Sequence, residues 1–129
     1  MFPHHPKHSY PYFLGYADER GAGVGEGYNR NCPLLPGTEA KAWFDALELL
    51  LQDIKRFGPD ELVVSLGVDA LEGDPISSFK LSSDDFLKLG ERLGKAGYST
   101  LFVFEGGYDV AALGINVTNV LQGFLARVP

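Results

Sequence analysis

Two short apolar segments, separated and flanked by longer amphipathic segments, limit the possible folds of this 129-residue chain more than any other feature. They are residues 61–66 (ELVVSL) and residues 100–104 (TLFVF). A nearly continuous apolar run of this length is typical of a strand that is covered on both faces. We therefore predict two buried strands at these positions.

Three segments with apolar residues at helical spacing alternate with the strands. We predict helices at residues 38–57, 83–95 and 109–126, the first capped by Thr38 and the second by Ser83. Glycines after the first two segments are expected to end those helices. The apolar face of the first helix is expected to consist of Trp43, Ala46, Leu47, Leu50, Leu51, Ile54 and Phe57.

The order helix, strand, helix, strand, helix indicates an α/β fold with parallel strands. Right-handed crossovers would place helices on both faces of the sheet, which gives a partial doubly wound arrangement. The length suits one domain, so residues 1–129 are expected to form a single domain.

Composition excludes several classes of protein. The net charge of −6 disfavours direct binding to nucleic acid, because an acidic surface repels phosphate. Cys32 is the only cysteine, so an intramolecular disulfide cannot form. No apolar run is long enough to cross a bilayer, and residues 1–20 lack the pattern of a signal peptide. We expect a cytoplasmic protein with no membrane or nucleic-acid partner.

Residues 1–37 are rich in glycine, proline and aromatic residues and are expected to be mostly loop, with a short strand at residues 29–35 as one option. Glycine occupies every second position from Gly21 to Gly27. This spacing allows positive φ angles or a close approach of the backbone. The run does not follow a strand or open a helix, so we interpret it as a structural loop and not as a dinucleotide site.

Asp69 and Tyr108 each follow a predicted strand, at the edge of the sheet where parallel α/β folds collect their binding sites. A carboxylate there suits a metal ligand, but it is also a common turn former. A phenol after Gly106 and Gly107 can donate a hydrogen bond to an oxyanion, or it can be a packed aromatic side chain. The pattern alone leaves these alternatives open.

Several motifs resemble, in the same order, those of the zinc-dependent histone deacetylase and acetylpolyamine amidohydrolase family, which belongs to the arginase–deacetylase superfamily. Residues 65–76 and their continuation to Leu81 resemble its third metal-ligand loop, and residues 104–108 (FEGGY) its catalytic-tyrosine loop. The Glu-Gly-Gly-Tyr form is more similar to the bacterial acetylpolyamine branch. The other matching parts are residues 10–15, the glycine-rich run, residues 31–34, Gly114, Asn116 and Asn119.

The resemblance implies a role for particular residues. Asp69 would be one of three zinc ligands, and Tyr108 would hydrogen-bond the substrate carbonyl and the tetrahedral oxyanion. If the loop keeps the shape that it has in the family, Glu105 would support Tyr108 without contacting the substrate. Apart from the resemblance, Asp74 follows the Gly73 turn and is expected to cap and orient its own loop and not to bind the metal. The substrate tunnel would be lined by Phe13, Ile76, Gly106 and Gly107.

The resemblance also implies that these residues correspond to the carboxyl-terminal part of a deacetylase domain. The family takes its other zinc ligands from an Asp-x-His segment, and its paired catalytic histidines from another, both preceding residue 1. His4, His5 and His8 do not resemble that pair. Because a catalytic zinc site needs about three protein ligands, we expect this chain to bind Zn²⁺ weakly or not at all by itself and to be inactive alone.

Two functions are therefore expected. The first is a segment of a zinc-dependent amidohydrolase that deacetylates acetylpolyamines or acetyl-lysine and is completed by an amino-terminal half. The alternative is a non-catalytic fragment that only binds or self-associates. A sheet that is cut through its middle exposes an edge and an apolar face, so we also expect a homo-oligomer.

Overall fold

The computed structural model describes residues 14–127, so the predictions for Phe13 and for the three histidines lie outside the described residues. The chain divides into two compact units, residues 1–38 and residues 39–129. Every α-helix and β-strand in the described part of the chain belongs to the second unit.

The described part of the first unit, residues 14–38, consists of turns and loops. Its one helical element is a single 3₁₀ turn, η1 (Gly23–Gly25), and Gly21 and Gly27 have positive φ angles of 92° and 87°. A β-carbon on Gly21 would collide with the backbone of Gly25, so the predicted structural use of the glycine-rich run is confirmed. Residues 29–35 do not form a strand, and that option is wrong. The Asn29 side chain instead donates a hydrogen bond to the backbone oxygen of Glu19 at 2.8 Å, which closes the loop.

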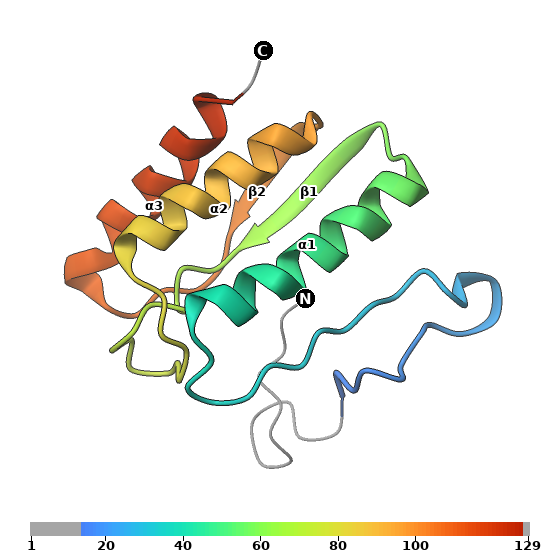
Figure 1. Cartoon of the computed structure of the whole chain (residues 1–129), viewed down its shortest axis with the longest axis horizontal. Coiled ribbons are helices and arrows are strands. Elements are labelled where there is room, and N and C mark those ends of the chain that lie inside the picture. The colour runs from blue at the N-terminus through green and yellow to red at the C-terminus, as the bar shows by residue number, and fades with distance from the viewer. Residues whose placement is uncertain (1–13, 128–129) are drawn as a thin grey trace. The chain divides into compact units, whose positions relative to one another are not determined.

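The second unit is an α/β fold with a two-stranded parallel sheet, as predicted. Glu61 lies opposite Ser99 and Leu66 opposite Phe104, so both strands end at the same edge, where the two arrowheads lie close together in Figure 1. The elements of this unit are α1 (Ala40–Phe57), β1 (Glu61–Leu66), α2 (Ser83–Ala96), β2 (Ser99–Phe104) and α3 (Val110–Leu125). None of the helices formed by residues 14–127 is long and apolar enough to cross a membrane.

The start of α1 differs from the prediction. The helix begins after Glu39, and the Thr38 hydroxyl donates to the backbone oxygen of Leu35 at 2.6 Å, so Thr38 is not the cap. The predicted ends of the first two helices are confirmed, because Gly58 and Gly97 adopt left-handed conformations with φ of 66° and 78°.

The cap of α2 is Ser82, one residue before the predicted Ser83. Asp85 lies three residues after Ser82 and accepts hydrogen bonds from its backbone nitrogen at 2.9 Å and its hydroxyl at 2.7 Å. In a capping box, the cap residue and the acidic residue are three positions apart. Ser82 and Asp85 have this spacing, whereas Ser83 is only two positions from Asp85. Burial alone would raise the pKa of Asp85, but hydrogen bonds from Lys88 and Ser82 outweigh it and hold that pKa below its ordinary value.

The helices cover only one face of the sheet. Phe102 points to that face, where its ring packs edge-on against Phe124 of α3 with the ring centres 5.1 Å apart. On the opposite face the side chains of Val63, Leu101 and Val103 are 64%, 62% and 41% exposed. Helices on both faces and strands buried on both faces were predicted, and residues 14–127 do not provide the second layer. An apolar run indicates that both faces of a strand are covered, but it does not identify the segment that covers each face.

α1 packs through its first two turns. Trp43, Phe44 and Leu47 are buried, whereas Phe57, predicted to lie on the apolar face, is exposed at the last turn. The guanidinium group of Arg92 on α2 lies 4.1 Å from the centre of the Phe44 ring, a cation–π contact that joins the two helices.

α2 and α3 approach so closely that their backbones touch. A β-carbon on Gly90 of α2 would lie 2.8 Å from the backbone nitrogen of Phe124, and one on Gly123 of α3 would lie 2.9 Å from that of Glu91. Both distances are shorter than real β-carbons show. The absence of a side chain at these glycines therefore sets the separation of the two helices.

Candidate functional site

The loops that follow β1 and β2 are joined by backbone hydrogen bonds. The Glu105 nitrogen donates to the Leu66 oxygen at 2.9 Å, and the Val68 nitrogen donates to the Gly106 oxygen at 2.7 Å. Parallel pairing therefore continues beyond the strands themselves. It places the loop that carries Asp69 beside the loop that carries Tyr108.

Gly106 lies between the two predicted site residues. A β-carbon on Gly106 would lie 2.5 Å from Oδ2 of Asp69 and 3.5 Å from Cε2 of Tyr108. The carboxylate and the phenol ring thus flank the same glycine. The structure brings together the two residues that the sequence singled out, and Gly106 keeps the space between them free of a side chain.

A second glycine lies beside the other oxygen of the Asp69 carboxylate. A β-carbon on Gly67 would lie 3.1 Å from Oδ1 of Asp69. Both oxygens of the carboxylate therefore lie close to glycine backbone.

Gly107 is required by the turn itself. Its φ of 154° is one that residues with a side chain rarely adopt. A β-carbon there would also lie 2.6 Å from Cγ2 of Val68 and 2.7 Å from Cδ1 of Leu113. The loop before Tyr108 is consequently packed against the Val68 loop and α3, with no space for a larger residue.

Tyr108 is 52% exposed, so its phenol can be reached by a substrate. Its backbone nitrogen donates to Oδ2 of Asp74 at 2.8 Å, and the Asp109 nitrogen donates to the same oxygen at 3.1 Å. Asp74 also accepts from the nitrogen of Ile76 through Oδ1 at 3.1 Å, which links the carboxylate to its own loop. The sequence did not reveal the bond to Tyr108, because the two residues are 34 positions apart and only the fold brings them together.

The donors for a metal ion are incomplete in the described part of the chain. Residues 14–127 contain no cluster of three or more histidine, cysteine, aspartate or glutamate side chains that could hold an ion. A catalytic zinc site needs about three protein ligands. Asp69 fits one of these positions by its chemistry, since a carboxylate is a common zinc ligand. The other ligands would have to come from outside the described residues.

The remaining predicted residues lie at the margins of this site. The Ile76 side chain is exposed, so it is accessible from solvent. Glu105 is exposed and uses its backbone nitrogen to pair with β1. These placements are compatible with a tunnel wall that includes Ile76 and with support of Tyr108 by Glu105.

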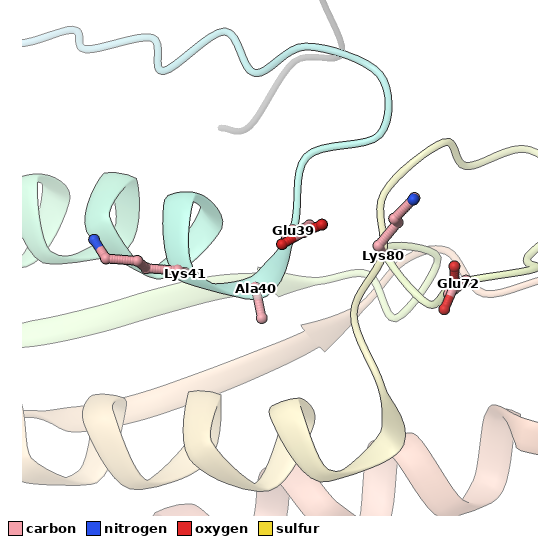
Figure 2. Close-up of a pocket in the computed structure, with 5 residues that line it drawn as sticks. All are labelled: Glu39, Ala40, Lys41, Glu72 and Lys80. Atoms are coloured by element: carbon pink, nitrogen blue, oxygen red, sulfur yellow. The ribbon is translucent and has the colours of Figure 1, made fainter.

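A shallow hollow of about 420 Å³ lies elsewhere on the second unit, between the start of α1 and the loop before α2 (Figure 2). Its charged groups are spread along its length, and Lys41 lies apart from the others along α1 in Figure 2. Neither Asp69 nor Tyr108 borders it, and its charges balance, so the strand ends remain the better candidate site. The residues that line the hollow are Glu39, Ala40, Lys41, Glu72 and Lys80.

Comparisons with known proteins agree with the motifs. The model of the histone deacetylase domain matches residues 1–124. The chain is 56% identical over 119 residues to acetylpolyamine amidohydrolase 2 of Pseudomonas aeruginosa, and 48% identical over 118 residues to the acetylpolyamine amidohydrolase of Mycoplana ramosa. Each alignment covers 92% of this chain and 35% of the relative. The chain thus spans about a third of the length of these curated relatives.

Solved structures give the same result for the fold. A crystal structure of acetylpolyamine aminohydrolase from Burkholderia pseudomallei superposes with a TM-score of 0.94 at 39% identity. The match covers 98% of this chain and 37% of that one. With the motifs, the paired loops and the family match in agreement, this chain belongs to the histone deacetylase family.

Proposed function

We propose that this chain supplies one zinc ligand, Asp69, and one oxyanion-stabilising phenol, Tyr108, to an amidohydrolase site that removes acetyl groups from acetylated amines. The observation that supports this most directly is the position of Gly106 between the two side chains. A β-carbon on Gly106 would lie within 3.5 Å of both Asp69 and Tyr108. A carbonyl group between them would meet a metal-ligating carboxylate on one side and a hydrogen-bond donor on the other.

An acetylpolyamine is the substrate class that the comparisons favour. Relatives named acetylpolyamine amidohydrolase reach 56% and 48% identity, whereas the histone deacetylase-like amidohydrolase of Pseudomonas aeruginosa reaches 34%. Substrate preference often follows the loops around a site. The Asp69 and Tyr108 loops lie within the segment that is shared with the first group.

In the proposed site, a bound zinc ion would polarise the amide carbonyl and activate water. Asp69 would hold the ion through its carboxylate. Tyr108 would donate its hydroxyl hydrogen to the carbonyl oxygen, and this hydrogen bond would strengthen as negative charge develops on that oxygen. The exposed phenol needs no rearrangement of the core to reach a substrate, because it lies at the edge of the sheet.

We further propose that the 129-residue polypeptide is inactive alone. Residues 14–127 contain no cluster of three or more side chains that could hold the ion, and the one ligand that we propose, Asp69, would hold zinc weakly by itself. The other ligands and the general base would come from a segment outside this sequence, on the same polypeptide or on a separate one.

A graft tests both parts of the proposal. The 129 residues would replace the corresponding third of acetylpolyamine amidohydrolase 2 from Pseudomonas aeruginosa, and deacetylation of an acetylpolyamine would be measured. We expect turnover by the graft, none by the isolated chain with added zinc, and a loss of about 10²- to 10³-fold in kcat for Tyr108→Phe in the graft, typical of removing one oxyanion donor.

Tyr98→Phe is the matched control for that substitution, because Tyr98 precedes β2 and so lies at the opposite end of the strand. It should leave kcat unchanged. Turnover by the isolated chain that Tyr108→Phe abolishes would contradict the proposed inactivity. An active graft that is indifferent to Tyr108→Phe would contradict the role of the phenol.

The open face of the sheet favours a second candidate, a non-catalytic module that self-associates. Val63, Leu101 and Val103 present adjacent apolar side chains on that face. We expect light scattering to show a concentration-dependent dimer of the isolated chain, and Leu101→Lys to abolish it. Leu49→Lys, which changes an exposed leucine on α1, should not. A monomer at every concentration would rule out this candidate.

A further inference from the structure

A buried carboxylate connects the two loops of the candidate site. Asp74 is 4% exposed and belongs to the loop after β1, yet Oδ2 accepts hydrogen bonds from the backbone nitrogens of Tyr108 and Asp109 after β2. Its other oxygen accepts from the nitrogen of Ile76. One side chain therefore fixes three backbone N–H groups in two loops.

These bonds act on the part of the backbone that carries the phenol. The residue before Tyr108 is Gly107, which is packed between Val68 and Leu113. The residue after it is Asp109, which caps α3. Its carboxylate accepts hydrogen bonds from the backbone nitrogens of the second and third residues of that helix. Tyr108 itself is 52% exposed, so packing constrains it less than it constrains Gly107. Its backbone orientation therefore depends on the hydrogen bond to Asp74.

Charge contributes to the strength of this contact. Hydrogen bonds from backbone N–H groups to an ionised carboxylate are roughly twice as strong as neutral ones. The Tyr108 and Asp109 nitrogens also precede α3, where the helix dipole favours negative charge. An asparagine at position 74 would keep the size of the side chain, but it would lose the charge and would replace one acceptor oxygen with an NH₂ donor.

We infer that Asp74 is a positioning residue that aims the Tyr108 phenol at the space beside Asp69. The inference rests on the proposed function, because it concerns how the phenol meets the substrate carbonyl. Asp74 is buried, and both of its carboxylate oxygens already accept hydrogen bonds from backbone nitrogens. It therefore does not present an oxygen to the substrate. It acts on the chemical step through Tyr108.

A double-mutant cycle in the graft tests this inference. Misplacing a reacting group by about 1 Å can cost about 10²-fold in rate, so we expect Asp74→Asn to lower kcat by about 10- to 100-fold. KM should change by less than about 2-fold, because the hydrogen bond from the phenol gains most of its strength as charge develops on the carbonyl oxygen in the transition state. In the Tyr108→Phe background the same substitution should lower kcat by less than about 3-fold, because residues that act as a unit are not additive.

Hydrogen exchange in the isolated 129-residue chain gives a second readout that does not depend on activity. Asp74→Asn should accelerate exchange of the Tyr108 and Asp109 amide protons at least about 10-fold, since each loses a charge-assisted hydrogen bond. The amides of β2 should keep their protection. Asp84→Asn is the control, because Asp84 is an exposed aspartate in the first turn of α2.

The outcomes separate this inference from the proposed function. Equal losses of kcat from Asp74→Asn with and without the Tyr108 hydroxyl would overturn the positioning role, as would unchanged exchange at Tyr108 and Asp109. A fully active Tyr108→Phe graft would overturn the proposed function and the catalytic part of this inference with it. If the Asn variant of the graft does not fold, Asp74→Glu, which keeps the charge, takes its place in the cycle.

Discussion

Gly123→Ala should destabilise the chain by about 3 kcal/mol, at the upper end of the cost of overpacking a close-packed interior. The added methyl group would meet the backbone of α2 at Leu87 and Glu91, and a backbone cannot move aside as a flexible side chain can. The helices would have to separate, which would weaken the packing of Phe124 on Phe102 as well. Urea denaturation followed by circular dichroism measures the change in the free energy of unfolding.

Gly114 provides a matched control on the same helix. A β-carbon on Gly114 would have no atom within 4 Å, and its φ is not positive. Gly114→Ala should therefore stabilise the chain by about 0.5 to 1 kcal/mol, because alanine has the higher helix propensity. Similar effects of the two substitutions would show that the close approach of α2 and α3 does not limit stability.

Gly106→Ala should impair the candidate site with little effect on the fold. Its methyl group would lie 2.5 Å from Oδ2 of Asp69, so the carboxylate would have to rotate away from the space beside Tyr108. In the graft we expect zinc affinity and kcat/KM each to fall by about 10- to 100-fold, which is the range for disturbing the support of a metal ligand. A chromogenic chelator measures the affinity, and initial rates measure kcat/KM.

Gly25→Ala is the control for a glycine in a loop, because a β-carbon there would meet nothing within 4 Å and the φ of Gly25 is not positive. It should leave zinc affinity and kcat/KM unchanged. If Gly106→Ala also left both quantities unchanged, Asp69 would not be the zinc ligand that we propose, and the space beside Gly106 would have no catalytic importance.

Local patterns carried most of the prediction of the fold. The helical spacing of apolar residues and the glycines after α1 and α2 located these elements, since both signals depend on neighbours within a few positions. The position of Asp69 and Tyr108 followed from the rule that parallel strands end at a common edge. The Ser82 cap was missed by one residue because two serines are adjacent and the interaction with Asp85 decides between them.

The contacts that could not be predicted are those between distant segments. No local pattern connects Asp74 with Tyr108, or Gly90 with the backbone around Phe124. The open face of the sheet was missed for a related reason. Val63 and Leu101 have the residue types of a covered strand, but coverage depends on what packs over them, and residues 14–127 place all three helices against the other face.

The backbone contact between α2 and α3 has a consequence for protein engineering. Main-chain atoms are common to all residue types, so the separation of these helices is insensitive to the identity of the side chains that point outward. Libraries that randomise exposed positions on α3, such as Thr118, Leu121 and Gln122, would preserve the spacing of the pair as long as the three contact glycines stay fixed. The pair could then serve as a rigid scaffold for displaying new surface chemistry. The glycines that prevent variation at the contact are Gly90, Gly94 and Gly123.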